Sequence, residues 1–343
     1  MLRPDAVFAS NAGATRGDPM KAIVQDTYGS ADVLALEDID KPAVGEGELL
    51  LRVHAASVFI GDWHIMTGLP YVFRTANGLR GPKVRVRGQD VAGRVEAVGK
   101  DVTGFQPGDE VFGTCNGSFA EYATARPNKI ASKPANLTFE QAAAVPVTGT
   151  TALQAVRKVG KVQEGQTVLV IGAAGSVGSF IVQIAKAFGG HVTGVCSTNQ
   201  MDLVRSIGAE DVVDYTRDDF AETGKSYDVI LVTAGHDSLS RLRRALGPRG
   251  TLVIVGAEGG GRWFGGIGRQ LRASLISPFV GQKMGTFVAR QNSDDLMVLK
   301  ELIETGKVTP VIGKTYPLSE VPEAVRHLTE GHGQGKVVIT VES

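Results

Sequence analysis

The sequence has few cysteines, no excess charge of either sign and no long hydrophobic run. Two cysteines among 343 residues cannot build a disulfide framework. Lysine and arginine together number 36, as do aspartate and glutamate, so the charge balance gives no support to a nucleic acid or an anionic membrane as a partner. No apolar run approaches the ~20 residues that a membrane span needs. We therefore expect a soluble, cytoplasmic protein with enough chain for two domains.

The first 19 residues differ in character from the rest of the chain. They show no hydrophobic periodicity and contain no apolar stretch long enough for a signal peptide. Asp5 and Asp18 argue against a transit peptide, which Arg3 and Arg16 would suit. We expect residues 1–19 to be a disordered extension, or to result from a start codon placed too early.

The stretch Thr167–Gly189 predicts a strand, a tight turn and a helix in immediate succession. Val168–Ile171 is an apolar, mostly β-branched run typical of a buried strand, and it stops at Gly172. After the turn, apolar residues recur at helical spacing, at Ile181, Ile184, Ala185 and Phe188. This succession is typical of the phosphate-binding corner of a dinucleotide-binding fold.

The turn consists of small residues, which would let a pyrophosphate approach the backbone N–H groups at the start of the helix. Its match to the pattern G-x-G-x-x-G is incomplete, because Ala173 stands in the first glycine position. Taken alone, such a turn is equally explained as a plain strand-to-helix connection. The predicted phosphate-binding residues are Ala174, Gly175, Ser176, Val177 and Gly178.

Strands and helices alternate after this corner, which predicts a doubly wound parallel α/β sheet. The expected strands are 191–197, 211–215, 227–234 and 251–255, and the expected helices are 199–207 and 238–246. The first half of the chain instead shows short β-like runs, the last of them at 119–123, which glycine and proline interrupt. A helix at 293–305 and a strand at 336–341 close the chain, so we expect the β-rich domain to resume there.

Several stretches in this order resemble the medium-chain dehydrogenase/reductase superfamily, specifically its zinc-free, quinone oxidoreductase-like branch. They include MKAIVQDTYGSADVL at Met20, GQDVAGRVEAVG at Gly88, FQPGDEVFG at Phe105, AAAVPVTGTTAL at Ala142 and GKVVITV at Gly335. The resemblance implies a GroES-like catalytic domain of residues 20–143 and 287–343, a Rossmann NADP-binding domain of residues 144–286, and a cofactor cleft between them. It also implies a homodimer formed through an edge of the Rossmann sheet, at 251–255 and 274–280.

Zinc alcohol dehydrogenases share this fold, but the residues here argue against a metal. Where the zinc enzymes carry Gly-His-Glu, this chain has Gly88, Gln89 and Asp90, and the first-ligand region AASVFIGD lacks cysteine. None of the six histidines pairs with another at ligand spacing. We therefore predict no zinc. Without a Lewis acid an ordinary alcohol is hard to oxidise, whereas hydride addition to a quinone or enone leaves charge that hydrogen bonds can hold.

The residues after the second strand of the nucleotide fold favour NADPH. An acidic residue about twenty positions after the turn would bind the ribose 2′-hydroxyl, but Ser197, Thr198 and Asn199 stand there. Their donors suit a 2′-phosphate, which a carboxylate would repel. The resemblance agrees, since NADPH-binding members carry a serine here and a tyrosine that corresponds to Tyr215. Helix capping explains the same hydroxyls, and the usual basic residue is not obvious, Arg205 being a helix turn or two away.

The resemblance places Thr148 and Thr151 near the nicotinamide ribose, although a plain helix start explains them nearly as well. Family members carry an asparagine beside the nicotinamide at the position of Phe59. The phenylalanine removes a donor and makes the pocket more apolar, so the proton donor must be sought elsewhere.

Tyr71 is the first candidate, because a neutral phenol can donate a hydrogen bond to a developing oxyanion without adding charge. Asp62 matches a family position and is the second candidate, with a structural role as the alternative. His64 also lies nearby in the sequence. Trp63, Phe73 and Phe279 are candidate pocket walls for a flat substrate, and core packing explains each of them as well.

We expect an NADPH-dependent reductase of quinones or α,β-unsaturated carbonyl compounds. One alternative is an enoyl-thioester reductase, in which the basic run of Arg80, Lys83, Arg85 and Arg87 would bind the phosphate of a carrier or of coenzyme A. A solvated loop is the simpler explanation of that run. A zinc-type alcohol dehydrogenase relative is a second alternative. A third is a non-catalytic NADPH-binding protein, such as a redox sensor or an RNA-associated crystallin-like protein.

Overall fold

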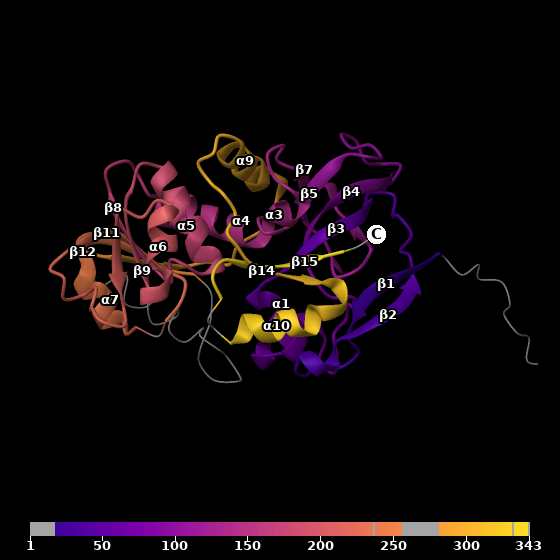
Figure 1. Cartoon of the computed structure of the whole chain (residues 1–343), viewed down its shortest axis with the longest axis horizontal. Helices are drawn as coiled ribbons and strands as arrows, with labels where there is room; N and C mark the ends of the chain where they lie inside the picture. The colour runs from indigo at the N-terminus through magenta and orange to yellow at the C-terminus, as the bar shows by residue number, and fades with distance from the viewer. Residues whose placement is uncertain (1–17, 236, 256–280, 331–332, 342–343) are drawn as a thin grey trace, which may run out of the picture.

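The computed structural model describes residues 18–235, 237–255, 281–330 and 333–341. Two α/β domains lie side by side along the long axis of the molecule, each built around its own sheet (Figure 1). The helices α3 and α4 lie between the sheets in this view (Figure 1). The predicted two-domain fold, with a β-rich domain and a parallel nucleotide-binding sheet, is therefore confirmed.

The nucleotide-binding sheet has six parallel strands in the order β10-β9-β8-β11-β12-β13. Their bounds are β8 Thr167–Ile171, β9 His191–Cys196, β10 Asp211–Asp214, β11 Tyr227–Val232, β12 Leu246–Ile254 and β13 Lys283–Thr286. The chain runs outward from β8 to β10 and then crosses to β11 on the other side. This reversal at β8 is where doubly wound sheets bind their ligands.

Helices connect the strands of this sheet. They are α5 Ser176–Ala187, α6 Met201–Ser206 and α7 Leu239–Ala245. α5 buries a continuous apolar face, including Phe180, Ile181 and Ile184, against the central strands. The helical spacing in the sequence marks this same face, because residues three and four apart share one side of a helix.

The second sheet has seven strands, with a path β14-β15-β3-β4-β5-β7 and with β6 also paired to β3. Their bounds are β3 Leu49–Val58, β4 Asp90–Val98, β5 Glu110–Thr114, β6 Tyr122–Ala125, β7 Ile130–Ser132, β14 Ile312–Pro317 and β15 Lys336–Thr340. Antiparallel pairing of β15 with β3 joins the C-terminal strand to the first half of the chain. A separate pair, β1 Pro19–Val24 with β2 Ala35–Asp40, covers one end.

Helices also pack around the second sheet and between the domains. They are α1 Ile60–Thr67, α2 Arg74–Asn77, α3 Phe139–Ala143, α4 Pro146–Gln154, α9 Ser293–Glu304 and α10 Val321–Thr329. Leu299 of α9 belongs to the same buried cluster as Leu153 of α4. The β-rich domain, through α9, therefore packs directly on α4, the helix that precedes the nucleotide-binding sheet.

Some predicted elements have different bounds. The apolar run at 119–123 is largely not a strand, because β6 begins at Tyr122 and the buried Phe119 fills the core from a loop. β12 begins at Leu246 rather than at residue 251, and it pairs with β13, so β12 is not the edge strand of this sheet. β1 begins at Pro19, within the predicted extension, and residues 274–280 lie outside the described part of the chain.

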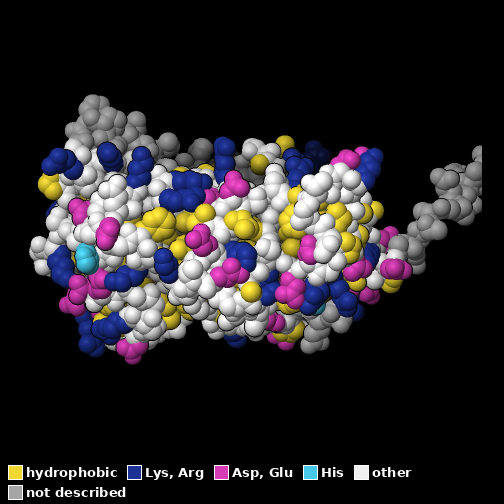
Figure 2. Space-filling view, turned by 90° about the horizontal axis from the view of Figure 1, so that it is seen from above, with side chains coloured by type: hydrophobic (Ala, Val, Ile, Leu, Met, Phe, Trp, Pro, Cys, Tyr) yellow, Lys and Arg dark blue, Asp and Glu magenta, His cyan; other side chains and the backbone are white. Residues whose placement is uncertain are grey.

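No helix in the described part of the chain is long and apolar enough to cross a membrane. Lysine and arginine side chains alternate with aspartate and glutamate over the face shown in Figure 2, in keeping with the neutral overall balance.

Candidate functional site

The predicted phosphate-binding corner forms where β8 ends. Gly172 leaves the strand with a φ of 83°, in the left-handed region, and a Cβ there would come within 2.6 Å of the Thr233 hydroxyl oxygen. A Cβ on Gly178 would lie 2.0 Å from the Gly172 carbonyl oxygen. Glycine at both positions therefore lets the helix start directly against the turn.

The start of α5 suits an anion. Gly175 is the N-cap, and the next residues, Ser176, Val177 and Gly178, form the first turn, whose N–H groups have no acceptor inside the helix. These groups carry the positive end of the helix dipole, and little side-chain bulk stands over them. The residues present fit the pyrophosphate of a dinucleotide.

The same turn is held by the segment that leads into β15. Ser176 Oγ donates a hydrogen bond of 2.7 Å to the Gly335 carbonyl, and the Gly335 N–H donates one of 3.1 Å to the Ala174 carbonyl. Gly335 has a φ of 63°, and a Cβ on it would lie 2.3 Å from the Val311 carbonyl oxygen. The Ser176 hydroxyl therefore bonds to the segment before β15, in the other domain. The Ser176 backbone N–H belongs to the first turn of α5.

Gly335 is followed by a lysine that is completely buried. Lys336 Nζ lies 3.1 Å from both Asp90 Oδ2 and the Val58 carbonyl oxygen. Asp90 also accepts hydrogen bonds from Ser57 Oγ, at 2.7 Å, and from the Val147 N–H, at 2.8 Å. Because Val147 is in the first turn of α4, the Asp90 carboxylate caps that helix.

Thr148 and Thr151 lie on α4, next to this cap. Each hydroxyl donates to the carbonyl four residues earlier, Thr148 to Ala144 at 2.9 Å and Thr151 to Val147 at 2.7 Å. Both side chains are therefore fixed by the helix itself. Their oxygen lone pairs remain as possible acceptors, and the assignment to the nicotinamide ribose stays a prediction.

The residues predicted to select the cofactor gather at the carboxyl ends of β9 and β10. Ser197 Oγ donates to Asn199 Oδ1 at 2.6 Å, and Thr198 Oγ1 bonds to Asp214 Oδ2. Tyr215 comes directly after Asp214 and is 61% exposed, so its ring is accessible. The structure brings these residues together, and their role in selecting the cofactor stays a prediction.

Asp214 is a carboxylate of this region that the sequence analysis missed. Hydrogen bonds from Thr198 and from Thr216 outweigh the effect of burial and lower the pKa of this carboxyl. Arg217 Nε lies 3.9 Å from Asp214 Oδ2 with most of its side chain exposed, whereas Arg205 is paired with Asp202 at 3.2 Å. Arg217, rather than Arg205, is the basic side chain next to the residues predicted to select the cofactor.

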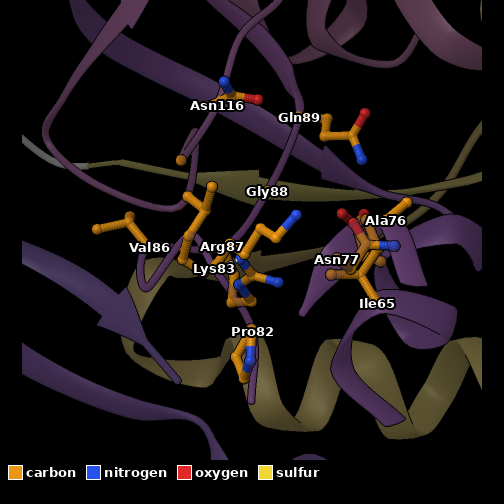
Figure 3. Close-up of a pocket in the computed structure, with 13 residues that line it drawn as sticks. Ile65, Ala76, Asn77, Pro82, Lys83, Val86, Arg87, Gly88, Gln89 and Asn116 are labelled. Carbon is orange, nitrogen blue, oxygen red and sulfur yellow. Dashed lines mark hydrogen bonds between the residues drawn. The ribbon is translucent and has the colours of Figure 1, made fainter. Parts of the chain in front are cut away.

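A cavity of about 210 Å³ lies in the β-rich domain, between α1, α2 and the segment that leads into β4. In Figure 3, Lys83 and Arg87 lie on one side of it and Asn77 and Ile65 on the other. The lining also includes Asp62, Val86, Gly88, Gln89, Asn116 and Gly117. A few polar side chains that converge beside apolar ones are a feature of ligand sites.

Asp62 is the predicted candidate that lines this cavity. Its side chain is buried, and Oδ2 accepts a hydrogen bond of 3.0 Å from the Phe59 N–H. Burial raises the pKa of the Asp62 carboxyl to about 7, against smaller opposing effects from that hydrogen bond, Lys336 and Arg87, while Asp90 raises it further. A carboxyl that titrates near neutral pH can both give and take a proton.

Replacing Asp62 by asparagine is expected to stabilise the protein at pH 8 by about 2 kcal/mol relative to wild type. The folded-state pKa is raised from 3.8 to about 7, so the contribution of Asp62 to stability is complete below pH 4 and is lost as the pH rises to 7. Urea unfolding at pH 5 and pH 8 measures the effect as the difference between variant and wild type. The exposed Asp101→Asn variant is the control, and an Asp62→Asn variant that keeps the wild-type pH dependence would contradict the expectation.

Tyr71, the other predicted proton donor, does not line this cavity. It lies in a short 3-10 turn after Pro70, half-buried, and the Arg74 guanidinium is 4.8 Å from its ring centre. Trp63 and Phe73 pack edge-on against His64, whose Nδ1 lies 2.7 Å from the Leu69 carbonyl. The role of Tyr71 stays a prediction, and Phe279 lies outside the described residues.

Among the described residues, no three histidine, cysteine, aspartate or glutamate side chains come together as a set of metal ligands. Two residues stand where zinc enzymes carry part of their Gly-His-Glu motif. Gln89 lines the cavity, and Asp90 forms an ion pair with Lys336. The absence of zinc remains a prediction.

Two family models match the chain: an alcohol dehydrogenase GroES-like domain over residues 45–135 and a zinc-binding dehydrogenase over residues 207–339. Among curated proteins, a mitochondrial NAD(P)H oxidoreductase of Mus musculus is 33% identical, with 96% of this chain and 91% of the relative covered. A chloroplastic NADPH-dependent alkenal/one oxidoreductase of Arabidopsis thaliana is also 33% identical, over 96% of this chain and 81% of the relative.

Solved structures agree with these relatives. The quinone oxidoreductase from Coxiella burnetii superposes with a TM-score of 0.84 at 29% identity, with 95% of this chain and all of that chain covered. The similarity extends over both domains.

Proposed function

Because this chain belongs to the quinone oxidoreductase-like branch of the medium-chain dehydrogenase/reductase superfamily, we propose that it is an NADPH-dependent, zinc-independent reductase of quinones or α,β-unsaturated carbonyl compounds. The main supporting observation is the phosphate-binding corner at the start of α5, where glycines and N–H groups without an acceptor inside the helix fit a pyrophosphate. The names of the relatives include both NADPH-dependent alkenal/one reduction and quinone reduction.

The residues that follow β9 favour NADPH over NADH. The hydroxyls of Ser197 and Thr198 stand where a carboxylate would otherwise bind a ribose 2′-hydroxyl. Tyr215 and Arg217 are exposed beside them and would contact a 2′-phosphate from the β10 side. The Asp214 carboxylate would repel a 2′-phosphate, but its oxygens accept hydrogen bonds from Thr198 and Thr216 and are directed to those two residues.

Zinc independence is supported by the charge beside Asp90. This carboxylate already bonds the Lys336 ammonium, the Ser57 hydroxyl and the Val147 N–H. A buried ammonium group at that place would repel a divalent cation.

In this proposal, NADPH supplies the hydride when bound, and the protein provides orientation and a proton. The N–H groups at the start of α5 would hold the pyrophosphate, and Thr148 and Thr151 would accept hydrogen bonds near the nicotinamide ribose. Asp62 would donate a proton to the enolate or phenolate oxygen and regain one from solvent, which its pKa of about 7 permits. Tyr71 is the second candidate for that proton.

The experiment that tests the function is optical measurement of NADPH oxidation with a matched panel of quinones, enones and enoyl-coenzyme A thioesters. We expect turnover with quinones or enones, little change on adding a chelator, and a lower kcat/KM with NADH. The Asp62→Asn variant is expected to keep its affinity for NADPH and to lose roughly 10²-fold in kcat, the scale of general acid catalysis.

Three different results would each favour another function. Turnover with thioesters alone would indicate an enoyl-thioester reductase, and chelator-sensitive alcohol oxidation would indicate a zinc enzyme. NADPH binding without any turnover would indicate a non-catalytic binding protein. The cytoplasmic location and the homodimer remain part of the proposal, and the relatives themselves are named as mitochondrial and chloroplastic.

A further inference from the structure

We propose that Arg87, assisted by Lys83, forms a subsite for a carboxylate carried by the substrate, so that the preferred enones are small unsaturated keto acids. This inference rests on the proposed reductase function and specifies its substrate class. It starts from the cavity beside Asp62, whose lining includes two basic side chains, Lys83 and Arg87.

Arg87 is the unusual residue of this cavity. It is only 8% exposed, and among the described residues it forms no ion pair, although the Asp62 carboxyl acts on it electrostatically. One guanidinium NH group bonds to the Val84 carbonyl, and Nε is buried without a hydrogen-bond partner among the described residues. Burial lowers the pKa of Arg87, but a guanidinium remains charged at neutral pH. The Val84 carbonyl and the Asp62 carboxyl, which raises the pKa of Arg87, offset only part of the cost of burying this cation, and an anionic ligand would offset more of it.

The neighbouring basic residues show that this arrangement is specific. Arg85, two positions earlier, lies on the surface and forms ion pairs with Asp26 at 2.6 Å and Glu37 at 3.0 Å. Lys83 lines the cavity together with Arg87. The basic run in the sequence is therefore divided: Arg85 has its partners on the surface, whereas Lys83 and Arg87 extend to the cavity.

The other groups in the cavity suit a carboxylate. Asn77, Gln89 and Asn116 add side-chain amides that can donate hydrogen bonds. Asp62 is the acidic residue of the lining, and with a pKa of about 7 it is largely protonated below that pH, so it adds little repulsion. The net charge of the lining is positive when Lys83 and Arg87 are counted against Asp62.

The size of the cavity separates a carboxylate from larger anions. About 210 Å³ is below the range of roughly 300–1,000 Å³ typical of sites for drug-sized ligands. It accommodates a short acid and is too small for the nucleotide part of coenzyme A. A bidentate pair between a guanidinium and a carboxylate is also the strongest arrangement that Arg87 can make.

The test compares a trans-4-oxo-2-alkenoate with its methyl ester, which differ in the one negative charge. With wild-type protein we expect a kcat/KM for the acid at least 10-fold above that for the ester. Arg87→Gln should lower the value for the acid by roughly 10- to 100-fold, the range for a charge-assisted hydrogen bond, and leave the ester within about 3-fold. Lys83→Gln should have a smaller effect in the same direction.

Three controls keep the test decisive. Arg85→Gln removes an equal charge from the surface and should leave the ratio of acid to ester unchanged. Arg87→Lys keeps the charge and should recover part of the preference. A saturated 4-oxo acid, titrated by calorimetry in the absence of NADPH, measures the subsite without turnover.

The outcomes separate the subsite from the reductase function. If ester and acid are reduced equally well by wild-type protein, or if Arg87→Gln weakens both alike, the subsite is wrong while the function stands. If neither compound is reduced but the saturated acid binds and Arg87→Gln abolishes that binding, the subsite stands and the function fails. A preference that depends on a coenzyme A phosphate, seen as faster turnover of an enoyl-coenzyme A than of the pantetheine thioester, would overturn the carboxylate assignment.

Discussion

Replacing Lys336 by alanine is expected to lower the free energy of unfolding by about 3–5 kcal/mol, the cost of leaving one member of a buried ion pair without its partner. Lys336 and Asp90 are both completely buried, at 3.1 Å from each other. Without the ammonium group, the Asp90 carboxylate keeps only the Ser57 hydroxyl and the Val147 N–H. The measurement is urea unfolding at pH 7.

The same substitution is expected to weaken NADPH binding. Asp90 caps α4, which carries Thr148 and Thr151, while Lys336 comes directly after Gly335, whose N–H and carbonyl hold the phosphate turn. Loss of the lysine therefore loosens both ends of the predicted cofactor site. Titration of NADPH by fluorescence should show a higher Kd, and an unchanged Kd would indicate that the pair stabilises the fold alone.

Two control variants identify the cause. The double variant Lys336→Met with Asp90→Asn removes both charges and keeps an acceptor for the Val147 N–H, so it should recover most of the lost stability. Lys21→Ala breaks an exposed pair with Asp38, at 3.7 Å, and should cost no more than about 1 kcal/mol. If the double variant were as unstable as the single one, the buried pair would not be the cause.

Replacing Asp295 by alanine is expected to lower the free energy of unfolding by about 3 kcal/mol. This buried carboxylate on α9 accepts hydrogen bonds from Gln154, Arg157 and Lys158 at 2.5–2.9 Å, and from Asn292 at 2.9 Å. These hydrogen bonds connect α9 to α4 and to the helical turn that follows α4. Thermal and urea unfolding measure the effect.

The pH dependence of this contribution has a defined sign. Burial opposes the ionisation of Asp295, but hydrogen bonds from Asn292, Lys158 and Gln154 outweigh it, so the pKa of the carboxyl lies below 3.8. The stabilisation is therefore present above pH 4 and is lost as the pH falls through the folded-state pKa. The difference between wild type and Asp295→Ala should shrink in acid. Asp294→Ala, which removes an exposed carboxylate next in sequence, should change stability by less than about 0.5 kcal/mol.

Much of the nucleotide-binding sheet could be predicted because its signals are local. The run Val168–Ile171, the glycine turn and the spacing within α5 each depend on adjacent residues, and they define β8 and α5 nearly to the residue. β14 and α10 were missed. β14, Ile312–Pro317, buries only Tyr316 fully, so its sequence lacks both the apolar run and the alternation by which a strand is found.

The parts of the candidate site that could be predicted are those whose residues lie in one continuous segment of the chain. The turn residues and Ser197 to Asn199 come directly after the strands that position them. The pair of Asp90 and Lys336 joins residues 246 positions apart, and it exists because β3 pairs with both β4 and β15. The burial of Arg87 likewise results from the pairing of its segment with β1, through the bond from its N–H to the Ile23 carbonyl. No local pattern distinguishes it from Arg85.

The contact between Gly335 and the phosphate turn also restricts how the two domains can move. Its two hydrogen bonds join Gly335, next to β15, to Ala174 and Ser176 of the other domain at one point. A rigid-body rotation that keeps both bonds must have its axis close to that point, and every other atom then travels in proportion to its distance from the axis. The phosphate turn therefore stays nearly still in any such rotation. A dinucleotide bound there would stay in place while parts of the two domains that lie farther from this contact move.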